Sequence, residues 1–324
     1  ALRAALFQLP DVRPQTPWAV ERDSFPVVWF RANDGEFWTR FRENPGIVVI
    51  VPCGEGEEAD FVKNDPILKE QIRFEEDVPI NVLSATRAKG CEYPAVVVYG
   101  FGKESETDLI KALQSGAVLS AGPDQTLPIQ YFVNRLYVAV SRPKNRLIVV
   151  DSDEGFAKLW RCTQDETIEA LMLDRVKNGR EVWGQLIEGM SIGKPADLSK
   201  QSAGDPLENA KAFEVEGKSR RDAFLLKQAA QGYRSAGEIT KAKECRARAL
   251  DVEGSWFDAG SAYLEAGFQD DAVRCLWLAG ADGWNELAHR STSEQLGARL
   301  ECNWAAVLVD KATLPAALSL LTRA

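Results

Sequence analysis

Five consecutive apolar residues, Ile47-Val48-Val49-Ile50-Val51, decide the fold predicted for the first half of the chain. Runs of this kind, without polar alternation, are typical of strands buried on both faces of a parallel sheet. Similar runs lie at 25–30, 80–83, 95–99 and 146–150. Helical patterns separate them at 34–43, 57–70 and 131–140, and another helix is expected at 1–8. The alternation predicts an α/β domain with a parallel sheet over residues 1–152.

The second half of the chain lacks such runs and is rich in Ala, Leu, Glu, Lys and Arg, which favour helices. We expect a helical connector and linker over 153–206 and helical repeats over 207–324. Seven residues recur there at a spacing of thirty positions: Ala229, Tyr233, Ala236, Gly237, Ala242, Cys245 and Ala249 are repeated as Ala259, Tyr263, Ala266, Gly267, Ala272, Cys275 and Ala279. The repeat predicts stacked helical hairpins, because one hairpin cannot bury its apolar stripe alone.

The spacing of Tyr, Gly and Ala within this repeat resembles that of the tetratricopeptide repeat (TPR), although that family has a period of roughly 34. Weaker copies are expected at Phe213 and Gly217 and at 304–317. The resemblance implies that 207–324 binds a protein partner. The alternative is a helical domain of two similar hairpins with no binding role.

Length, net charge and residue composition exclude several classes of protein. A length of 324 residues predicts two domains, at about 100–200 residues each. The net charge of −9 argues against a basic protein that coats nucleic acid, and no apolar stretch reaches the roughly 18 residues of a membrane span. The six scattered cysteines predict reduced thiols in an intracellular protein, cytoplasmic or associated with the nucleoid or nucleus. With His289 as the single histidine, we expect no metal site and no Ser-His-Asp catalysis.

Two segments place polar and basic residues at the margin of the predicted sheet, where α/β folds bind ligands. The first is Ser84-Ala85-Thr86-Arg87-Ala88-Lys89-Gly90-Cys91-Glu92-Tyr93-Pro94, and the second is Asn134-Arg135-Leu136-Tyr137-Val138-Ala139-Val140-Ser141-Arg142-Pro143-Lys144. The chain has no acid between Asp124 and Asp151, and this interval contains Arg135, Arg142, Lys144 and Arg146. Such a positive stretch suits phosphate or a nucleic-acid backbone; the alternative is a solvated helix face.

Together the two segments resemble motifs V and VI of the UvrD-like superfamily 1 helicases. The first follows the pattern T-x-H-x-A-K-G-x-E-[FWY], with Ser84 at the Thr and Thr86 at the His. The second follows L-Y-V-A-x-[ST]-R-x-K from Leu136 to Lys144. The resemblance covers about 25–151 and implies the second RecA-like lobe of a P-loop NTPase.

The resemblance implies roles for individual residues. Arg142 matches the arginine finger that reaches the γ-phosphate of ATP, and its planar fork of donors suits phosphate oxygens. Glu92 matches the carboxylate that accepts from a ribose hydroxyl, and Lys89 and Gly90 match a loop that senses the nucleotide state. The positions that touch the single-stranded DNA backbone in this family are Ser84, Thr86 and Arg87.

A shorter match lies at the end of the first strand. Phe30-Arg31-Ala32-Asn33 is similar to motif IV, which would make Arg31 a second arginine at the γ-phosphate. A solvated arginine at a strand end is the alternative.

The chain lacks a Walker A loop, G-x-x-x-x-G-K-[ST], and a Walker B acid. Gly100-Phe101-Gly102-Lys103-Glu104 is not one, because Val97 stands where the first Gly belongs and Glu104 would repel phosphate. We therefore expect that most ligands of ATP and Mg²⁺ come from a first lobe upstream of Ala1, and that this chain alone is inactive.

The sequence thus predicts the C-terminal half of an ATP-dependent DNA helicase, with a 3′ to 5′ direction by family analogy. Two alternatives stay open: an RNA helicase, and a non-catalytic scaffold in which the helical repeats do the work. The acidic residues Glu55, Glu57, Glu58 and Asp60 are expected to supply favourable charge at the start of a helix.

Overall fold

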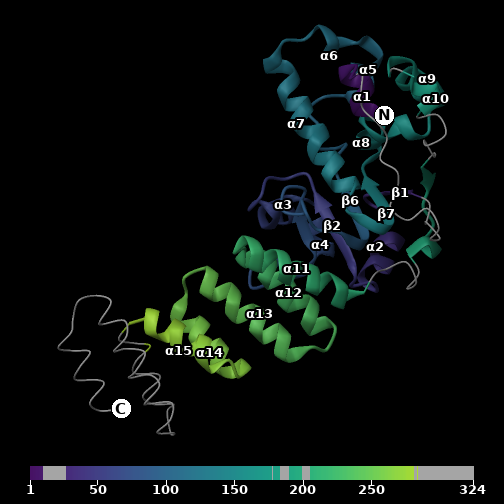
Figure 1. Ribbon diagram of the computed structural model, residues 1–324. Helices are drawn as coiled ribbons and strands as arrows, with labels where there is room; N and C mark the ends of the chain where they lie inside the picture. The colour runs from purple at the N-terminus through teal and green to yellow at the C-terminus, as the bar shows by residue number, and fades with distance from the viewer. Residues whose placement is uncertain (10–26, 177, 183–189, 199–204, 281–282, 284–324) are drawn as a thin grey trace, which may run out of the picture. The chain divides into compact units, whose positions relative to one another are not determined.

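The chain folds into two compact units, Ala1–Ala212 and Phe213–Ala324 (Figure 1). The first contains a parallel sheet with helices, and the second is helical in its described part. The prediction of an α/β domain followed by helices is confirmed. The described residues of the expected connector, 153–206, belong to the first unit. This computed structural model describes residues 1–9, 27–176, 178–182, 190–198, 205–280 and 283.

The central sheet has six strands in the order β5-β2-β6-β7-β1-β8, and every neighbouring pair is parallel. The strands β2, β6 and β7 lie inside the sheet and carry fully buried Val and Ile residues, as their apolar runs predict. The bounds are β1 Val28–Arg31, β2 Ile47–Val51, β5 Val82–Ser84, β6 Tyr93–Tyr99, β7 Pro143–Asp151 and β8 Ser191–Ile192.

Helices cover both faces of the sheet (Figure 1). On one face, Phe37 and Trp38 of α2 (Gly35–Arg42) pack in one cluster with side chains of β2, β6 and β7. On the other face, the rings of Trp29 and Phe156 lie 4.2 Å apart. The helices α1, α5, α8 and α9 contact one another there. Their bounds are α1 Leu2–Phe7, α5 Leu109–Ser115, α8 Asp153–Lys158 and α9 Glu166–Arg175, and smaller elements of this unit are α6 Ala117–Ser120, η1 Trp160–Thr163, α10 Gly179–Val182 and η2 Pro195–Leu198.

The single helix expected at 57–70 is wrong. The segment forms two helices, α3 (Glu58–Asn64) and α4 (Leu68–Gln71). The break lies at Asp65, whose carboxylate accepts hydrogen bonds of 2.9 Å from the backbone N–H groups of residues 67 and 68. Because Pro66 cannot donate a helical hydrogen bond, the first helix ends there and the second begins.

Other boundaries also differ from the prediction. The helix expected at 131–140 is α7 (Pro123–Val140), which begins before the predicted start and continues through Pro128. Proline at the first helical position is favourable because its missing N–H would have no partner there. The strands β3 (Phe74–Glu75) and β4 (Val78–Pro79), and β8 at the sheet edge, were not predicted. Two residues are too few to produce an apolar run.

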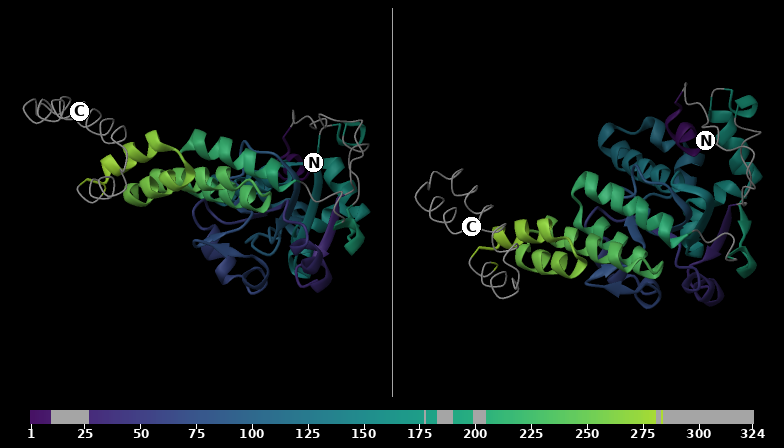
Figure 2. Two further views of the ribbon diagram at one scale, coloured as in Figure 1. Left: turned by 90° about the horizontal axis from the view of Figure 1, so that it is seen from below. Right: turned by 60° about the horizontal axis from the view of Figure 1, so that its bottom comes forward.

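The second unit contains the predicted repeat. Tyr233 and Tyr263 occupy α12 and α14, while Cys245 and Cys275 are fully buried in α13 and α15. Consecutive helices contact one another and lie side by side in Figure 2. Each repeat is therefore a helical hairpin, whereas the copy expected at 304–317 lies outside the described residues. The bounds are α11 Pro206–Arg220, α12 Ala223–Ser235, α13 Ile239–Val252, α14 Trp256–Ala266 and α15 Gln269–Leu278.

Two buried carboxylates connect helices of the second unit. Glu214 of α11 accepts hydrogen bonds from the hydroxyl of Tyr233 and from Lys218. Burial alone would raise the pKa of Glu214, but these two hydrogen bonds outweigh it and hold the pKa below its ordinary value of 4.5. Glu244 of α13 has a pKa lowered in the same way, because hydrogen bonds from Lys241 and Arg248 outweigh its burial.

We expect the second unit to lose stability as the pH falls below about 4.5, the ordinary pKa of a glutamate. Both carboxyl groups have lower pKa values in the folded chain, so their stabilisation is complete above that pH and is lost as the pH falls through the folded-state values. Hydrogen-exchange protection of α12 and α13 should therefore drop steeply on acidification. Glu214→Gln with Glu244→Gln should flatten this dependence, and the exposed-site control Glu238→Gln should not. Equal slopes in all three proteins would contradict the expectation.

Candidate functional site

The two helicase-like segments meet at the amino-terminal edge of the sheet. Glu92 directly precedes β6 and Arg142 directly precedes β7, and these strands are neighbours. The backbone N–H of Tyr93 donates to the carbonyl oxygen of Arg142 at 3.0 Å, and Tyr93 pairs in register with Pro143. Residues that are fifty positions apart in the chain therefore lie side by side.

The guanidinium of Arg142 is held in place by uncharged groups. Its Nε donates to the carbonyl of Val138 at 3.1 Å, Nη1 to the carbonyl of Cys91 at 3.0 Å, and Nη2 to the hydroxyl of Ser141 at 2.9 Å. The side chain is half-buried. Within the described part of the chain it has no carboxylate partner. Three of its five N–H groups are used, so an oriented positive charge remains with two free donors.

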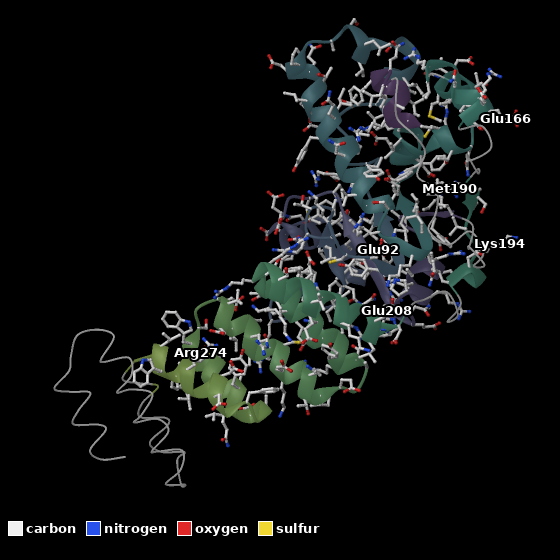
Figure 3. The ribbon with its side chains drawn as sticks, viewed as in Figure 1. Glu92, Glu166, Met190, Lys194, Glu208 and Arg274 are labelled. Atoms are coloured by element: carbon white, nitrogen blue, oxygen red, sulfur yellow. The ribbon has the colours of Figure 1, made fainter. Side chains whose placement is uncertain are left out.

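Three further predicted residues lie on the loop before β6, whose Cys91 carbonyl accepts from Arg142. Glu92, Lys89 and Gly90 are all exposed, and Figure 3 labels Glu92. Among the described residues, the Glu92 carboxylate has no hydrogen-bond or ion-pair partner. Gly90 has a φ of 92°, in the left-handed region that favours glycine. Glu92, whose carboxylate forms no ion pair among the described residues, thus directly follows Cys91, whose carbonyl oxygen accepts from the Arg142 guanidinium.

Arg31 lies at the opposite edge of the sheet. It ends β1, pairs in register with Asp151 at the end of β7, and donates from Nε to Asp153 at 2.8 Å. Arg142 precedes the other end of the nine-residue strand β7, so the two backbones are separated by roughly 30 Å at ~3.3 Å per strand residue. Two arginines at that separation cannot reach one phosphate group. The structure does not bring Arg31 to the site of Arg142.

The residues predicted to touch nucleic acid lie at the end of β5 and in the loop after it, at the carboxyl-terminal edge. Thr86 is exposed, whereas Ser84 and Arg87 are buried. Arg87 donates from Nη1 to Glu58 at 2.9 Å, and the Ser84 backbone N–H donates to the same carboxylate at 3.2 Å. Glu55 lies 3.9 Å from the Arg87 guanidinium. Glu58, expected only as charge at a helix start, therefore forms a buried ion pair that ties α3 to this loop.

The basic stretch does not form one positive surface. Arg135 donates to the backbone carbonyl of Cys53 beyond β2, and its guanidinium lies over the ring of Tyr131, with 5.4 Å to the ring centroid. Lys144 pairs with Glu208 at 2.6 Å. Arg146 is 1% exposed, lies 3.9 Å from a carboxylate oxygen of Asp197, and has its pKa lowered by burial. Arg135, Lys144 and Arg146 are close in sequence, but each has a different partner.

The turn after β6, Gly100–Lys103, is closed by a buried carboxylate. Asp151 accepts from the backbone N–H groups of Gly102 at 2.6 Å and Lys103 at 3.1 Å. A Cβ on Gly102 would lie 2.1 Å from the carbonyl oxygen of Gly155, so only glycine fits. Burial raises the pKa of Asp151, although the hydrogen bonds it accepts oppose this shift. Neither amide is left for a phosphate, which supplies a structural reason why this turn differs from a P-loop.

Among the described residues, no cluster of three or more His, Cys, Asp or Glu side chains is arranged to hold a metal ion. No helix in the described ranges is both long and apolar enough to cross a membrane. Comparisons of the chain with protein-family models, curated proteins and solved structures found no match.

We expect Glu58→Ala to lower the free energy of unfolding by about 3 kcal/mol, because the buried Arg87 would lose its carboxylate at 2.9 Å and keep the weaker contact to Glu55 at 3.9 Å. Replacing both side chains, as in Glu58→Leu with Arg87→Leu, should recover much of this loss. The exposed neighbour Asp60→Ala serves as the control and should cost less than about 1 kcal/mol. Urea unfolding followed by circular dichroism measures all three. A loss for Glu58→Ala no larger than for the control would refute the expectation.

Proposed function

We propose that this chain supplies the second, RecA-like lobe of a UvrD-like ATP-dependent DNA helicase, followed by a TPR-like helical unit. One observation carries the proposal: Arg142 and Glu92 precede neighbouring strands at one sheet edge, and neither side chain forms an ion pair among the described residues. A half-buried guanidinium of this kind suits an anion with several oxygens, and phosphate fits its fork of donors.

In this proposal Arg142 acts on ATP held chiefly by another lobe. That lobe would supply the Walker residues and most ligands of Mg²⁺, which neutralises phosphate charge when bound. Contacts to Val138, Cys91 and Ser141 hold the Arg142 side chain in advance. Two N–H groups remain to stabilise the charge that develops on the γ-phosphoryl oxygens. Because the side chain is already oriented, little reorganisation is needed when the lobes meet.

Glu92 and its loop would bind the nucleoside part. The exposed carboxylate would accept from a ribose hydroxyl, and Lys89 and Gly90 would relay nucleotide state along the loop. This loop runs from Ser84 at the carboxyl-terminal edge to Glu92 at the amino-terminal edge. Of the residues proposed for the DNA track, Thr86 is the one whose side chain is exposed. The loop thereby links the nucleotide edge to the nucleic-acid edge.

We infer that the helical unit binds a protein partner. The support is its repetition: two successive hairpins place Ala259 and Ala272, and the equivalent Ala229 and Ala242, in buried contacts between helices. Stacked hairpins of this type produce extended surfaces for protein ligands. No part of the ATPase proposal depends on this inference.

Arg142→Ala, in the longer protein that includes the Walker lobe, should lower ATP turnover by about 10³-fold, because an arginine finger contributes on that scale. ATP binding should change only a few-fold. Arg142→Lys should not restore turnover, since an ammonium lacks the planar fork. Steady-state ATPase assays with single-stranded DNA, and in parallel with single-stranded RNA, measure the effect and report the preferred nucleic acid.

Lys144→Ala is the matched control for this experiment. Lys144 lies two positions further along the chain, is exposed and pairs with Glu208. Its loss should leave turnover within a few-fold of the unmodified protein. Equal loss of turnover in both variants, or full turnover in Arg142→Ala, would remove the arginine-finger assignment.

Glu92→Ala should remove the preference for ATP over 2′,3′-dideoxy-ATP, because the carboxylate would no longer accept from the ribose. The KM for ATP should rise by about tenfold, the scale of one charged hydrogen bond, while the KM for the dideoxy nucleotide changes little. Asp124→Asn, at an exposed acid on α7, provides the control. A parallel rise in both KM values would show that Glu92 has a structural role only.

A further inference from the structure

A pocket of about 290 Å³ lies at the carboxyl-terminal edge of the sheet, outside the ends of β2 and β6. After β2 the chain passes to β5 on one side, and after β6 it passes to β7 on the other side. Adjacent parallel strands whose connections leave in opposite directions open a crevice between them, and open α/β sheets bind ligands in such a crevice. The pocket therefore lies where the topology itself provides a site.

The pocket is lined by the segments that follow the two strands and by α7. Pro52 follows β2, residues 104–107 follow β6, and Tyr131, Phe132 and Arg135 come from α7. Apolar walls are completed by Leu109 and Ile129. The volume is near the lower end of the range for small-molecule sites, about 300–1,000 Å³. It accommodates one side chain or a small ligand.

Of the three charged side chains that line the pocket, Arg135 and Glu104 have partners and Glu106 has none among the described residues. Arg135 is engaged by the backbone carbonyl of Cys53 and by the ring of Tyr131. Glu104 lies 3.8 Å from the ammonium of Lys103. Glu106 is exposed and, within the described ranges, has neither an ion pair nor a hydrogen bond to its carboxylate. An anionic ligand would meet two carboxylates and one guanidinium here, a lining with a net charge of −1 (two negative charges against one positive), so the pocket disfavours phosphate.

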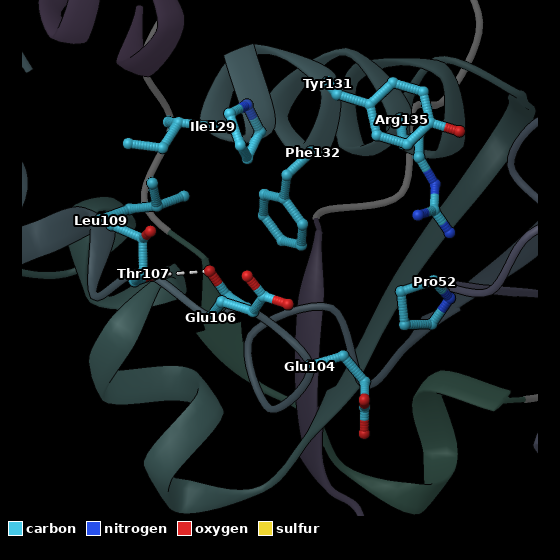
Figure 4. Close-up of a pocket in the computed structure, with 11 residues that line it drawn as sticks. Pro52, Glu104, Glu106, Thr107, Leu109, Ile129, Tyr131, Phe132 and Arg135 are labelled. Atoms are coloured by element: carbon cyan, nitrogen blue, oxygen red, sulfur yellow. Dashed lines mark hydrogen bonds between the residues drawn. The ribbon is translucent and has the colours of Figure 1, made fainter. Parts of the chain in front are cut away.

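Figure 4 shows the carboxylate of Glu106 and the ring of Phe132 on facing sides of the pocket. A cation between them would gain a charge-assisted hydrogen bond from one side and the negative face of the ring from the other. We propose that this pocket binds an organic cation, a guanidinium at the end of a short apolar stem, such as an arginine side chain of a protein partner. The stem would lie against Leu109 and Ile129.

This site is separate from the one assigned to ATP. The pocket lies beyond the carboxyl ends of the strands, whereas Arg142 and Glu92 precede their amino ends. Its ligand also has the opposite charge. The inference therefore does not rest on the proposed ATPase, and either proposal can fail without the other.

n-Butylguanidine, a guanidinium on a four-carbon apolar stem, tests the pocket directly. Titrated into the full chain and followed by calorimetry, it should bind at millimolar concentrations. Glu106→Gln should weaken binding by about tenfold through loss of the charged acceptor. Phe132→Leu should weaken it several-fold, since the apolar volume stays and the ring face is lost. Asp124→Asn, outside the pocket on the same helix, should change nothing.

The proposal fails if n-butylguanidine does not bind the folded chain, or if Glu106→Gln and Asp124→Asn have the same effect. It also fails if n-butanol, which has the stem without the cation, binds equally well. A parallel titration with a short single-stranded oligonucleotide covers the competing ligand class. If the pocket substitutions weaken oligonucleotide binding and leave n-butylguanidine binding unchanged, the site belongs to nucleic acid instead. Circular dichroism of each variant verifies that it is folded.

Discussion

The buried carboxylate of Asp151 is the interaction on which the arrangement of the α/β unit depends. A carboxylate with no exposure is costly unless its oxygens are satisfied, and here it accepts from Gly102, Lys103, Ser152 and the indole N–H of Trp160. These donors fasten the end of β7 to the turn after β6 and to η1. The turn after β6 positions residues 104–107, which form one wall of the pocket. One buried charge thus determines the shape of the carboxyl-terminal edge.

Helix α7 connects this edge with the opposite one. Arg135 donates to the carbonyl of Cys53 beyond the end of β2, and Arg142, just after the helix, donates to the carbonyl of Cys91 before β6. Both arginines use carbonyl groups of neighbouring loops, so the same helix defines a wall of the pocket and the orientation of the proposed arginine finger. A rigid element that contacts two separate sites is a route by which a ligand at one could influence the other.

Apolar runs predicted the strands β2, β6 and β7 because strands buried on both faces need uninterrupted apolar residues. The motif spacing placed Glu92 and Arg142 just before two strands, which parallel pairing then makes neighbours. Three features were not predicted. Pro66 divides a helix within an acidic, helix-like segment. The partner of Arg87 is 29 positions away. Arg31 lies at the opposite edge from Arg142 because it ends its strand, whereas Arg142 precedes one; in a parallel sheet these positions lie at opposite edges, and the motif resemblance overlooked this.

The net charge of −9 disfavours long-range attraction of nucleic acid, and the local contacts explain how a phosphate ligand could still be recognised. Within the basic stretch, Lys144 and Arg146 face carboxylates, and Arg135 is stacked on Tyr131. Arg142 contacts carbonyl and hydroxyl oxygens, which orient a guanidinium without cancelling its charge. Recognition would therefore depend on short-range geometry at a half-buried site, which salt screens less than an exposed basic surface.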